Sequence, residues 1–341
     1  MSEAPVLEVS ASVDPAGWDE EVASLDGGPF HSHAWAQYRA NERDGKPLFI
    51  RWTSSGAPTS LGLAVGVRIP PPRGISVFGS AIEIPTVPAG SGPEDPGAAL
   101  FRWAADRRNV AALELESFDA DASWAAPTLR TFSRRDRIEF IAHPADRASA
   151  ISRMRSGTRS AIRRAENAGF GVRSAVDLRE HQRFAELHAA TLARLRTQKG
   201  IRGDITNTKS FARRLHGFVR TSRAELFVAG RDGNDVAAGC VFARFGGRAY
   251  YLLNGATDEA RTAGATPLIL AEAISRLYAH GIERINLGGT PAAARDPESA
   301  DHGLYSFKLG LGAEPVERSS LSVRLPGVRG RVRQLASFAR R

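Results

Sequence analysis

The sequence predicts an α/β fold class of the α+β type, with two tandem units whose sheets are mixed and mostly antiparallel. Three observations favour this class. Strand-like and helix-like segments alternate along the chain. Hairpin-length turns such as 231–234 and 246–247 join several strands. The two halves also repeat the same order of strands. A doubly wound, all-parallel sheet is therefore disfavoured.

Hydrophobic periodicity and turn residues define the expected elements. In the first half we expect strands at 48–53, 61–69, 75–78 and 111–116, and helices at 18–25, 33–40 and 98–107. In the second half we expect strands at 171–176, 225–229, 236–245, 249–254 and 284–287, and helices at 149–168, 178–195, 210–221 and 266–280.

The two halves resemble copies of one unit. The strands that start at 61, 75 and 111 each have a counterpart about 174 residues later. We infer a tandem duplication whose join lies near 145–150. The predicted domains are 1–147 and 148–326, followed by a basic tail at 327–341.

Composition limits the class of protein. The chain has 341 residues, of which 42% are hydrophobic and 24% charged, so it is globular and long enough for two domains. No apolar stretch approaches the roughly 20 residues that span a bilayer. The N-terminus has no basic segment followed by an apolar one, as a signal peptide would. We therefore expect a cytoplasmic protein.

Cysteine and histidine usage predicts no metal site. The single cysteine, Cys240, excludes an internal disulfide and a cysteine-cluster metal site, and its apolar neighbours favour buried filler over a nucleophile. The eight histidines show no metal-ligand spacing.

Basic residues are unevenly distributed, and the formal net charge of +9 favours a polyanionic partner. Arg155, Arg159 and Arg163 recur at a spacing of four in the expected helix 149–168, which would place them on one face. The second basic element, 329–341, has two alternatives: peripheral contact with membrane or nucleic acid, or a frayed soluble tail.

Lys308 is unusual because this chain almost never uses lysine. Of its 46 basic residues only four are lysines, at 46, 199, 209 and 308. A lysine offers a compact ammonium, whereas arginine offers a planar guanidinium. The apolar neighbours of Lys308 are typical of a partly buried catalytic cation. The alternative is a lysine whose stem lies on an amphipathic turn while its amine reaches water.

Several segments together carry a family resemblance. They follow one another in the order Thr158–Ala165 through Val172, Thr191 with Arg194, Tyr250–Ala256, Leu287–Gly289 and Leu304–Lys308. In this order the chain resembles the FemABX family, whose members are aminoacyl-tRNA-dependent peptidyltransferases made of two GNAT-like domains. The resemblance is strong over roughly residues 150–315 and faint in the first half. It implies two tandem GNAT-like domains and transfer of an amino acid from aminoacyl-tRNA to a primary amine.

The resemblance also implies roles for single residues. Lys308, in the Phe307–Lys308 motif, would stabilise charge in the transition state. Glu116, which shares a strand face with Glu114, would act as a base or bind the acceptor amine, with a solvent-facing strand edge as the alternative. The expected acceptor-binding residues are Arg194, Arg39, Tyr251 and Phe307. For Arg194 the competing interpretation is a helix-surface ion pair, and for Tyr251 it is core packing. The helix bearing Arg155, Arg159 and Arg163 is the expected tRNA-binding surface.

The acceptor would be a peptidoglycan precursor or a small amine of antibiotic biosynthesis. We expect no cofactor, because aminoacyl-tRNA is a co-substrate, and we expect no DNA partner. The principal alternative is an acyl-CoA-dependent GNAT N-acyltransferase using acetyl-CoA. The loop 261–267 argues against it, since Thr266 adds bulk and Pro267 removes a donor where a pyrophosphate-binding turn needs small residues and amides. An RNA-binding module without activity is a third alternative, which would leave Lys308 unexplained.

Overall fold

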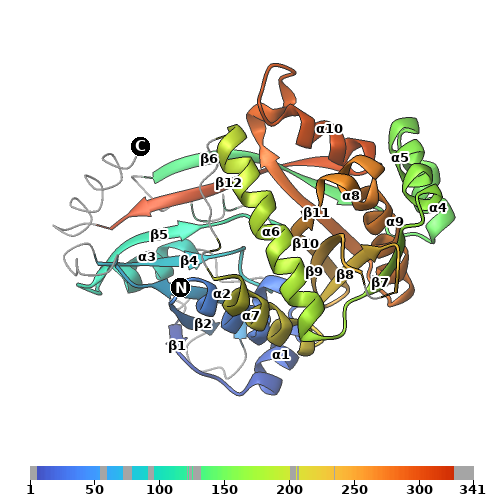
Figure 1. The fold of residues 1–341 in the computed structure, drawn as a ribbon. Coiled ribbons are helices and arrows are strands. Elements are labelled where there is room, and N and C mark those ends of the chain that lie inside the picture. Colours follow the sequence, from blue (N-terminus) through green and yellow to red (C-terminus); the bar gives the residue numbers. More distant parts are fainter. Residues whose placement is uncertain are drawn as a thin grey trace. The chain divides into compact units, whose positions relative to one another are not determined.

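The computed structural model describes residues 6–53, 60–71, 79–90, 96–120, 122, 125, 132–199, 205, 207–233 and 235–325. The chain forms two compact units. Unit 1 comprises Met1–Arg137 and Arg318–Arg341, and unit 2 comprises Ile138–Glu317. The labels of the elements are those in Figure 1.

Unit 1 is a sheet with helices on both faces. Its strands lie in the order β1 (Val6–Ser10), β2 (Lys46–Thr53), β3 (Ser60–Ile69), β4 (Ser80–Ile84), β5 (Val110–Leu115) and β12 (Glu314–Arg324). β4 and β5 are parallel, and the other neighbours are antiparallel. Its helices are α1 (Pro15–Ser24), α2 (His33–Glu42) and α3 (Pro96–Ala105).

Alternation along β2 explains the two faces of this sheet. Ile50 and Trp52 belong to the core that α3 covers. Phe49, which precedes Ile50 and therefore points to the opposite face, packs edge-on against Trp18 of α1, with ring centroids 5.1 Å apart. Side-chain caps start the covering helices, since Asp14 accepts from the backbone N–H of Gly17 in α1 and Ser32 accepts from that of Trp35 in α2.

Unit 2 repeats this plan. Its strands lie in the order β6 (Phe132–Ala142), β11 (Arg284–Pro291), β10 (Arg248–Ala256), β9 (Ala238–Phe245), β8 (Ala224–Gly230) and β7 (Gly171–Ser174). Its helices include α4 (Arg147–Arg153), α5 (Ser156–Asn167), α6 (Leu178–Lys199), α7 (Thr208–Arg220), α8 (Asp258–Ala263), α9 (Ala265–Ala279) and α10 (His302–Gly310). β10 and β11 are parallel, whereas β7 to β10 are successively antiparallel.

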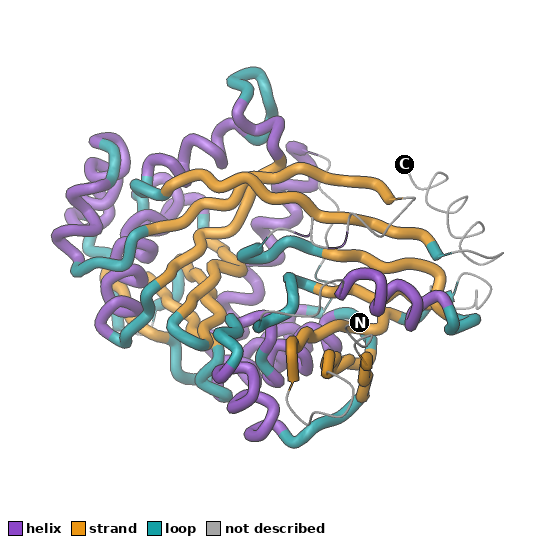
Figure 2. The backbone as a smooth tube through the Cα atoms, turned by 180° about the vertical axis from the view of Figure 1, so that it is seen from behind, coloured by secondary structure: helices purple, strands orange, loops and turns teal. Residues whose placement is uncertain are grey.

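Both faces of the unit 2 sheet are covered. Phe227 and Phe242 face a core shared with α4, α5 and α9. Leu226 and Val241, adjacent along the same strands, face a second core shared with α6 and α7. Figure 1 shows α6 crossing in front of β9 and β10, and Figure 2 shows the strands from behind, with helices flanking them.

The matching strand order agrees with a duplicated unit, and two strands cross the unit boundaries: β6 begins in unit 1 and ends in unit 2, and β12 begins in unit 2 and ends in unit 1. β12 follows unit 2 in sequence but pairs with β5, where Leu321 lies opposite Leu115. β6 follows unit 1 in sequence and lies next to β11. The units therefore divide the chain at 137/138 and 317/318, whereas the sequence suggested boundaries at 147/148 and 326/327. The cause is strand pairing between distant segments, which periodicity does not reveal.

Two further details differ from expectation, and two expected segments are not tested. The single helix expected at 149–168 is two helices, α4 and α5, because Met154 and Arg155 adopt extended backbone and the N–H of Arg155 donates to the carbonyl of Gly310. The elements β1, β4, β6, β12, α8 and α10 were not expected. The strand expected at 75–78 and the tail at 327–341 lie outside the described residues. Among the helices that the structure describes, none is long and apolar enough to cross a bilayer.

Candidate active site

Lys308 is buried in unit 2, although it is a lysine on a short helix. The residue is 5% exposed, and its Nζ donates a hydrogen bond to the carbonyl oxygen of Gly289 at 3.2 Å. The Nζ also lies 5.5 Å from the ring centroid of Phe140, within the range of a cation–π interaction. Its amine therefore does not reach out to water as a snorkelling lysine would.

Two glycines of β11 make room for this amine. Gly288 has φ +73°, a left-handed conformation that other residues adopt at a cost. A Cβ added there would lie 3.2 Å from the carbonyl oxygen of Tyr251 and 3.3 Å from the Nζ of Lys308. The Gly288–Gly289 pair thus permits the close approach of β11 to Lys308.

A buried polar cluster lies beside these glycines. The registered pairing of β10 with β11 ends at Tyr250 and Asn286, and both side chains turn to the carboxylate of Glu139 on β6. The hydroxyl of Tyr250 donates to Oε1 and the Nδ2 of Asn286 donates to Oε2, each at 2.8 Å. Sequence reasoning missed Glu139. Its signal is a lone acid inside the apolar run Ile138–Ile141.

Tyr251 points the other way, into the core. Its hydroxyl accepts a hydrogen bond from the Sγ of Cys240 at 3.6 Å, and its ring stacks on Phe242 with centroids 5.3 Å apart. Burial raises the pKa of the Tyr251 hydroxyl, and it raises the pKa of the Cys240 thiol to about 12. Both contacts favour core packing for Tyr251 and filler for Cys240. Phe307 is half-buried and packs against the same core.

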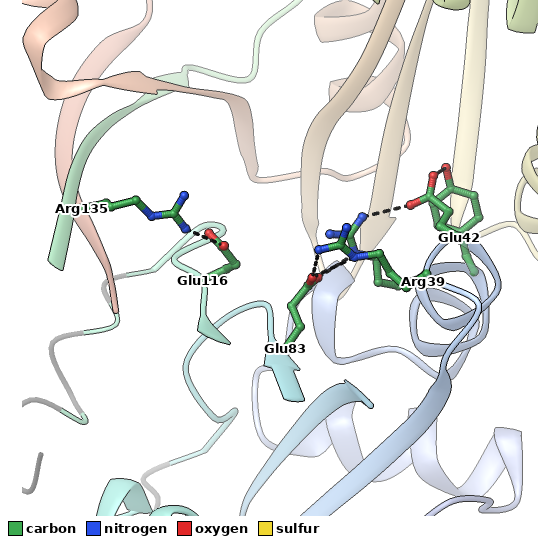
Figure 3. A network of polar contacts seen from close by, with 7 residues as sticks. Arg39, Glu42, Glu83, Glu116 and Arg135 are labelled. Atoms are coloured by element: carbon green, nitrogen blue, oxygen red, sulfur yellow. Dashed lines mark hydrogen bonds and ion pairs between the residues drawn. The ribbon is translucent and has the colours of Figure 1, made fainter. Parts of the chain in front are cut away.

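Arg39 lies in unit 1 and is held by carboxylates of its own unit (Figure 3). Its Nε donates to Glu83 at 2.7 Å and its Nη1 to Glu42 at 3.2 Å, while Arg43 also binds Glu83 at 2.8 Å. Burial alone would lower the pKa of Arg39, but the two carboxylates outweigh it and raise that pKa. These contacts favour a structural role for Arg39 in an ion-pair network over a role in binding the acceptor.

Glu116, also in unit 1, follows the end of β5. Figure 3 shows its ion pair with Arg135, in which Nη2 and Oε1 lie 2.9 Å apart. Its other oxygen accepts from the hydroxyl of Ser320 at 3.2 Å. The Glu116 side chain is 22% exposed and that of Arg135 67%. The carboxylate therefore lies beside a cation that water can reach.

Arg194 is half-buried on α6. Within the described residues its guanidinium hydrogen-bonds the side chain of Gln198 at 3.3 Å and forms no ion pair. The helix-surface ion pair that competed with acceptor binding is therefore absent from the described part of the chain.

The arginine surface lies on α5 and its N-terminus. Arg155 is the extended N-cap residue, so it is not on the helix face with Arg159 and Arg163, as the sequence suggested. Arg155 and Arg163 are exposed. Arg159 is partly buried because its Nη1 donates to the carbonyl of Met154. Two of the three arginines thus present their charge to solvent.

The segment expected to resemble a pyrophosphate-binding loop is helical. Thr257 caps α8, and the N–H groups of Arg261 and Gly264 donate to carbonyls one turn earlier. Gly264 has φ +95° and ends α8 where α9 begins. A Cβ there would lie 2.4 Å from the carbonyl oxygen of Ala161 in α5, so the two helices pack closely at this point. These amides are occupied within the protein and do not form an open anion cradle.

Comparisons with known proteins identify the fold. Residues 152–309 match the family described as Acetyltransferase (GNAT) domain. No curated protein sequence matches the chain. The crystal structure of FemX is similar with a TM-score of 0.72 and 16% identity, covering 96% of this chain and 99% of that one.

Two further solved structures support the same fold. The C-terminal domain of a putative lysylphosphatidylglycerol synthetase from Agrobacterium fabrum is 14% identical, with a TM-score of 0.54 and coverage of 95% and 97%. A tandem GNAT protein from the clavulanic acid biosynthesis pathway is 13% identical, with a TM-score of 0.52 and coverage of 94% and 99%. The expected fold class and the resemblance to the FemABX family are confirmed at the level of fold.

Proposed function

Because the chain has a tandem GNAT fold similar to that of FemX, we propose that it is an aminoacyltransferase that moves an amino acid from aminoacyl-tRNA onto a primary amine. The observation that carries the proposal is the buried ammonium of Lys308, held by Gly289 in the GNAT-matching part of the chain.

The reaction needs charge stabilisation more than a nucleophilic side chain. A neutral amine attacks the ester carbonyl that joins the amino acid to the terminal ribose. The resulting tetrahedral oxyanion collapses with loss of the ribose oxygen, and an amide remains. We assign Lys308 to stabilise the oxyanion or the leaving oxygen, a contribution of about 3 kcal/mol for one preorganised donor. We assign Glu116 to bind the acceptor amine or to take its proton.

Substrate binding follows from charge. The exposed Arg155 and Arg163 would contact tRNA phosphates, and Arg194 would bind a phosphate of the acceptor through its two-pronged guanidinium. A peptidoglycan precursor or a small amine of specialised metabolism would serve as acceptor. Arg39 and Tyr251 stay lesser candidates, since both are engaged within their own units.

An acyl-CoA-dependent N-acyltransferase is the second candidate, and the GNAT domain match favours it. Thr266 adds bulk and Pro267 removes a backbone donor in the first turn of α9, and both weigh against CoA, because a pyrophosphate binds free N–H groups at a helix start.

One assay separates the two candidates. The protein is incubated with tRNA charged with radiolabelled amino acids, or with labelled acetyl-CoA, together with a panel of amines. We expect amide-linked label only from tRNA, a rate lowered by roughly 10²- to 10³-fold in Lys308→Met, and no transfer after ribonuclease treatment. Transfer from acetyl-CoA alone would reverse the assignment, and transfer from neither would remove both.

A further inference from the structure

Glu139 is fully buried in unit 2, yet the chemistry above gives it no task. Burying an ionised carboxylate is expensive unless its oxygens are well bonded, and a glutamine of similar shape would avoid the cost. Both of its oxygens accept hydrogen bonds from polar side chains, those of Tyr250 and Asn286. A specific reason for a carboxylate is therefore to be sought in what it bonds.

The carboxylate determines which way Asn286 faces. The hydrogen bonds from Tyr250 and Asn286 are both donated to this carboxyl group, and the amide of Asn286 turns its NH₂ group toward Oε2. The Oδ1 of Asn286 is then directed to the backbone N–H of Gly288, which donates to it at 2.8 Å. A glutamine at 139 can donate as well as accept, so it could bond the Asn286 amide in either orientation. In the flipped orientation the NH₂ group of Asn286 would face the backbone N–H of Gly288, and that hydrogen bond would be lost.

The fixed N–H of Gly288 in turn defines the path of the backbone toward Lys308. Gly288 holds φ +73°, and the next carbonyl, that of Gly289, accepts from the Nζ of Lys308. Three elements of unit 2 are thereby linked: β6 through the carboxylate, β11 through the amide and the glycines, and α10 through the ammonium.

We propose that Glu139 is a positioning residue for Lys308, acting through Asn286 and the Gly288–Gly289 backbone to hold the carbonyl that orients the ammonium. The proposal rests on the assignment of Lys308 in the proposed function. A lysine side chain is flexible, and a charge stabilises a transition state best when it is already in place. Glu139 helps to hold the Lys308 ammonium in place without touching the substrate.

The first test asks whether Glu139 acts only through Lys308. With whichever donor supports turnover, Glu139→Gln should lower kcat about tenfold, the scale of losing a residue that orients a catalytic group, and leave KM for both substrates within about twofold. In a Lys308→Met background the same change should cause no further loss. If Glu139→Gln lowers kcat equally in the wild-type and Lys308→Met backgrounds, Glu139 has a general structural role. If it leaves kcat unchanged in the wild-type background, Glu139 has no role in catalysis. Either result overturns the proposal.

Tyr250→Phe is the matched control, because it removes a hydrogen bond from the same carboxylate without breaking the route through Asn286. It should lower Tm by an amount similar to Glu139→Gln but keep kcat within about threefold. Asn286→Ser, which removes the amide and leaves the carboxylate, should reproduce the loss of kcat. If Tyr250→Phe lowers kcat as much as Asn286→Ser, the route through Asn286 is wrong.

A second readout needs no substrate, so it remains decisive even if the aminoacyltransferase assignment fails. With only four lysines in the chain, ¹³C-lysine labelling gives few Cε signals in an NMR spectrum, and Lys308→Met identifies that of Lys308. Glu139→Gln and Asn286→Ser should shift this signal and leave those of Lys46, Lys199 and Lys209 in place, while Tyr250→Phe should shift it little. A Lys308 signal that coincides with that of the wild type in both variants would overturn the proposal.

Discussion

The Nζ of Lys308 on α10 and the carbonyl oxygen of Gly289 on β11 lie 3.2 Å apart, which joins a catalytic candidate to a backbone group 19 residues earlier in the chain. This contact explains how a flexible side chain can keep one position inside unit 2. Substitutions in β11 should therefore change the position of the Lys308 amine while residue 308 itself stays a lysine.

Lys308→Met should lower kcat by roughly 10²- to 10³-fold, because it retains the apolar stem and deletes the charge that stabilises the transition state. Substrate binding should change little. Lys308→Arg should restore only part of the rate, since a guanidinium is larger and directs its donors differently. Steady-state kinetics together with Tm measure both effects. Full activity of Lys308→Arg would contradict the role.

Gly288→Ala should reduce both stability and kcat. An alanine at φ +73° costs about 1–2 kcal/mol, and its Cβ would press on the Nζ of Lys308 at 3.3 Å. Gly281→Ala is the control, because Gly281 has φ +76° and nothing within 4 Å of an added Cβ. The control should lose a similar free energy of unfolding but keep its kcat. Equal kcat values for the two variants would show that the crowding at Lys308 has no effect on catalysis.

Reversing the exposed arginines near α5 should weaken binding of charged tRNA. Arg155→Glu with Arg163→Glu should raise Kd more than tenfold and reduce the slope of log Kd against log salt, because fewer counterions are released. Arg159 is left unchanged because it bonds the carbonyl of Met154. Arg213→Glu with Arg220→Glu, on exposed positions of α7, makes the same change in net charge. If both pairs weaken binding equally, the site on α5 is wrong.

Arg194→Lys should raise the apparent KM for the acceptor much more than the KM for charged tRNA, because lysine retains the charge and loses the two-pronged donor set. Arg179→Lys, on the exposed surface of the same helix, should change neither. Equal effects of Arg194→Lys on the two substrates would indicate a structural role for Arg194.

Stability should fall as the pH drops below about 6.5, the ordinary pKa of histidine. Burial is the largest cause that lowers the pKa of His181, and the neighbouring His216 lowers it further, against opposing contributions from the Asp177 carbonyl and Glu180. The unfolded chain therefore binds a proton at a pH where the folded chain does not, which favours unfolding on the acid side.

His181→Gln tests this sign. Urea unfolding between pH 7 and pH 5 should give a flatter dependence of the free energy of unfolding than the wild type gives. Other groups, such as His33, whose pKa is also lowered by burial, titrate in both proteins and cancel in the difference. Identical slopes would mean that His181 titrates normally in the folded state.

Several parts of this protein were predictable from the sequence because they depend on local chemistry. The apolar run 236–245 and the amphipathic pattern at 210–221 lie close to β9 and α7. Lys308 was conspicuous through composition alone, as a lysine in a chain that otherwise uses arginine. The spacing of the arginines predicted the basic surface. Hydrophobic periodicity predicted one continuous helix, whereas the structure has α4 and α5 separated at Met154.

Tertiary structure decided what depends on segments far apart in the chain. The return of β12 to pair with β5 joins segments far apart in the chain, and such pairing leaves no mark in either segment alone. The role of Arg39 in an ion-pair network became visible only from its contact with Glu83, which lies 44 residues away along the chain. Glu139 was not singled out from the sequence, and its role became visible only through its hydrogen bonds with Tyr250 and Asn286. The sequence by itself predicted the repeated α/β unit and singled out Lys308 as a candidate, because periodicity and residue choice are local. Only the fold decided what holds the ammonium, because a hydrogen bond depends on distance in space and not on separation along the chain.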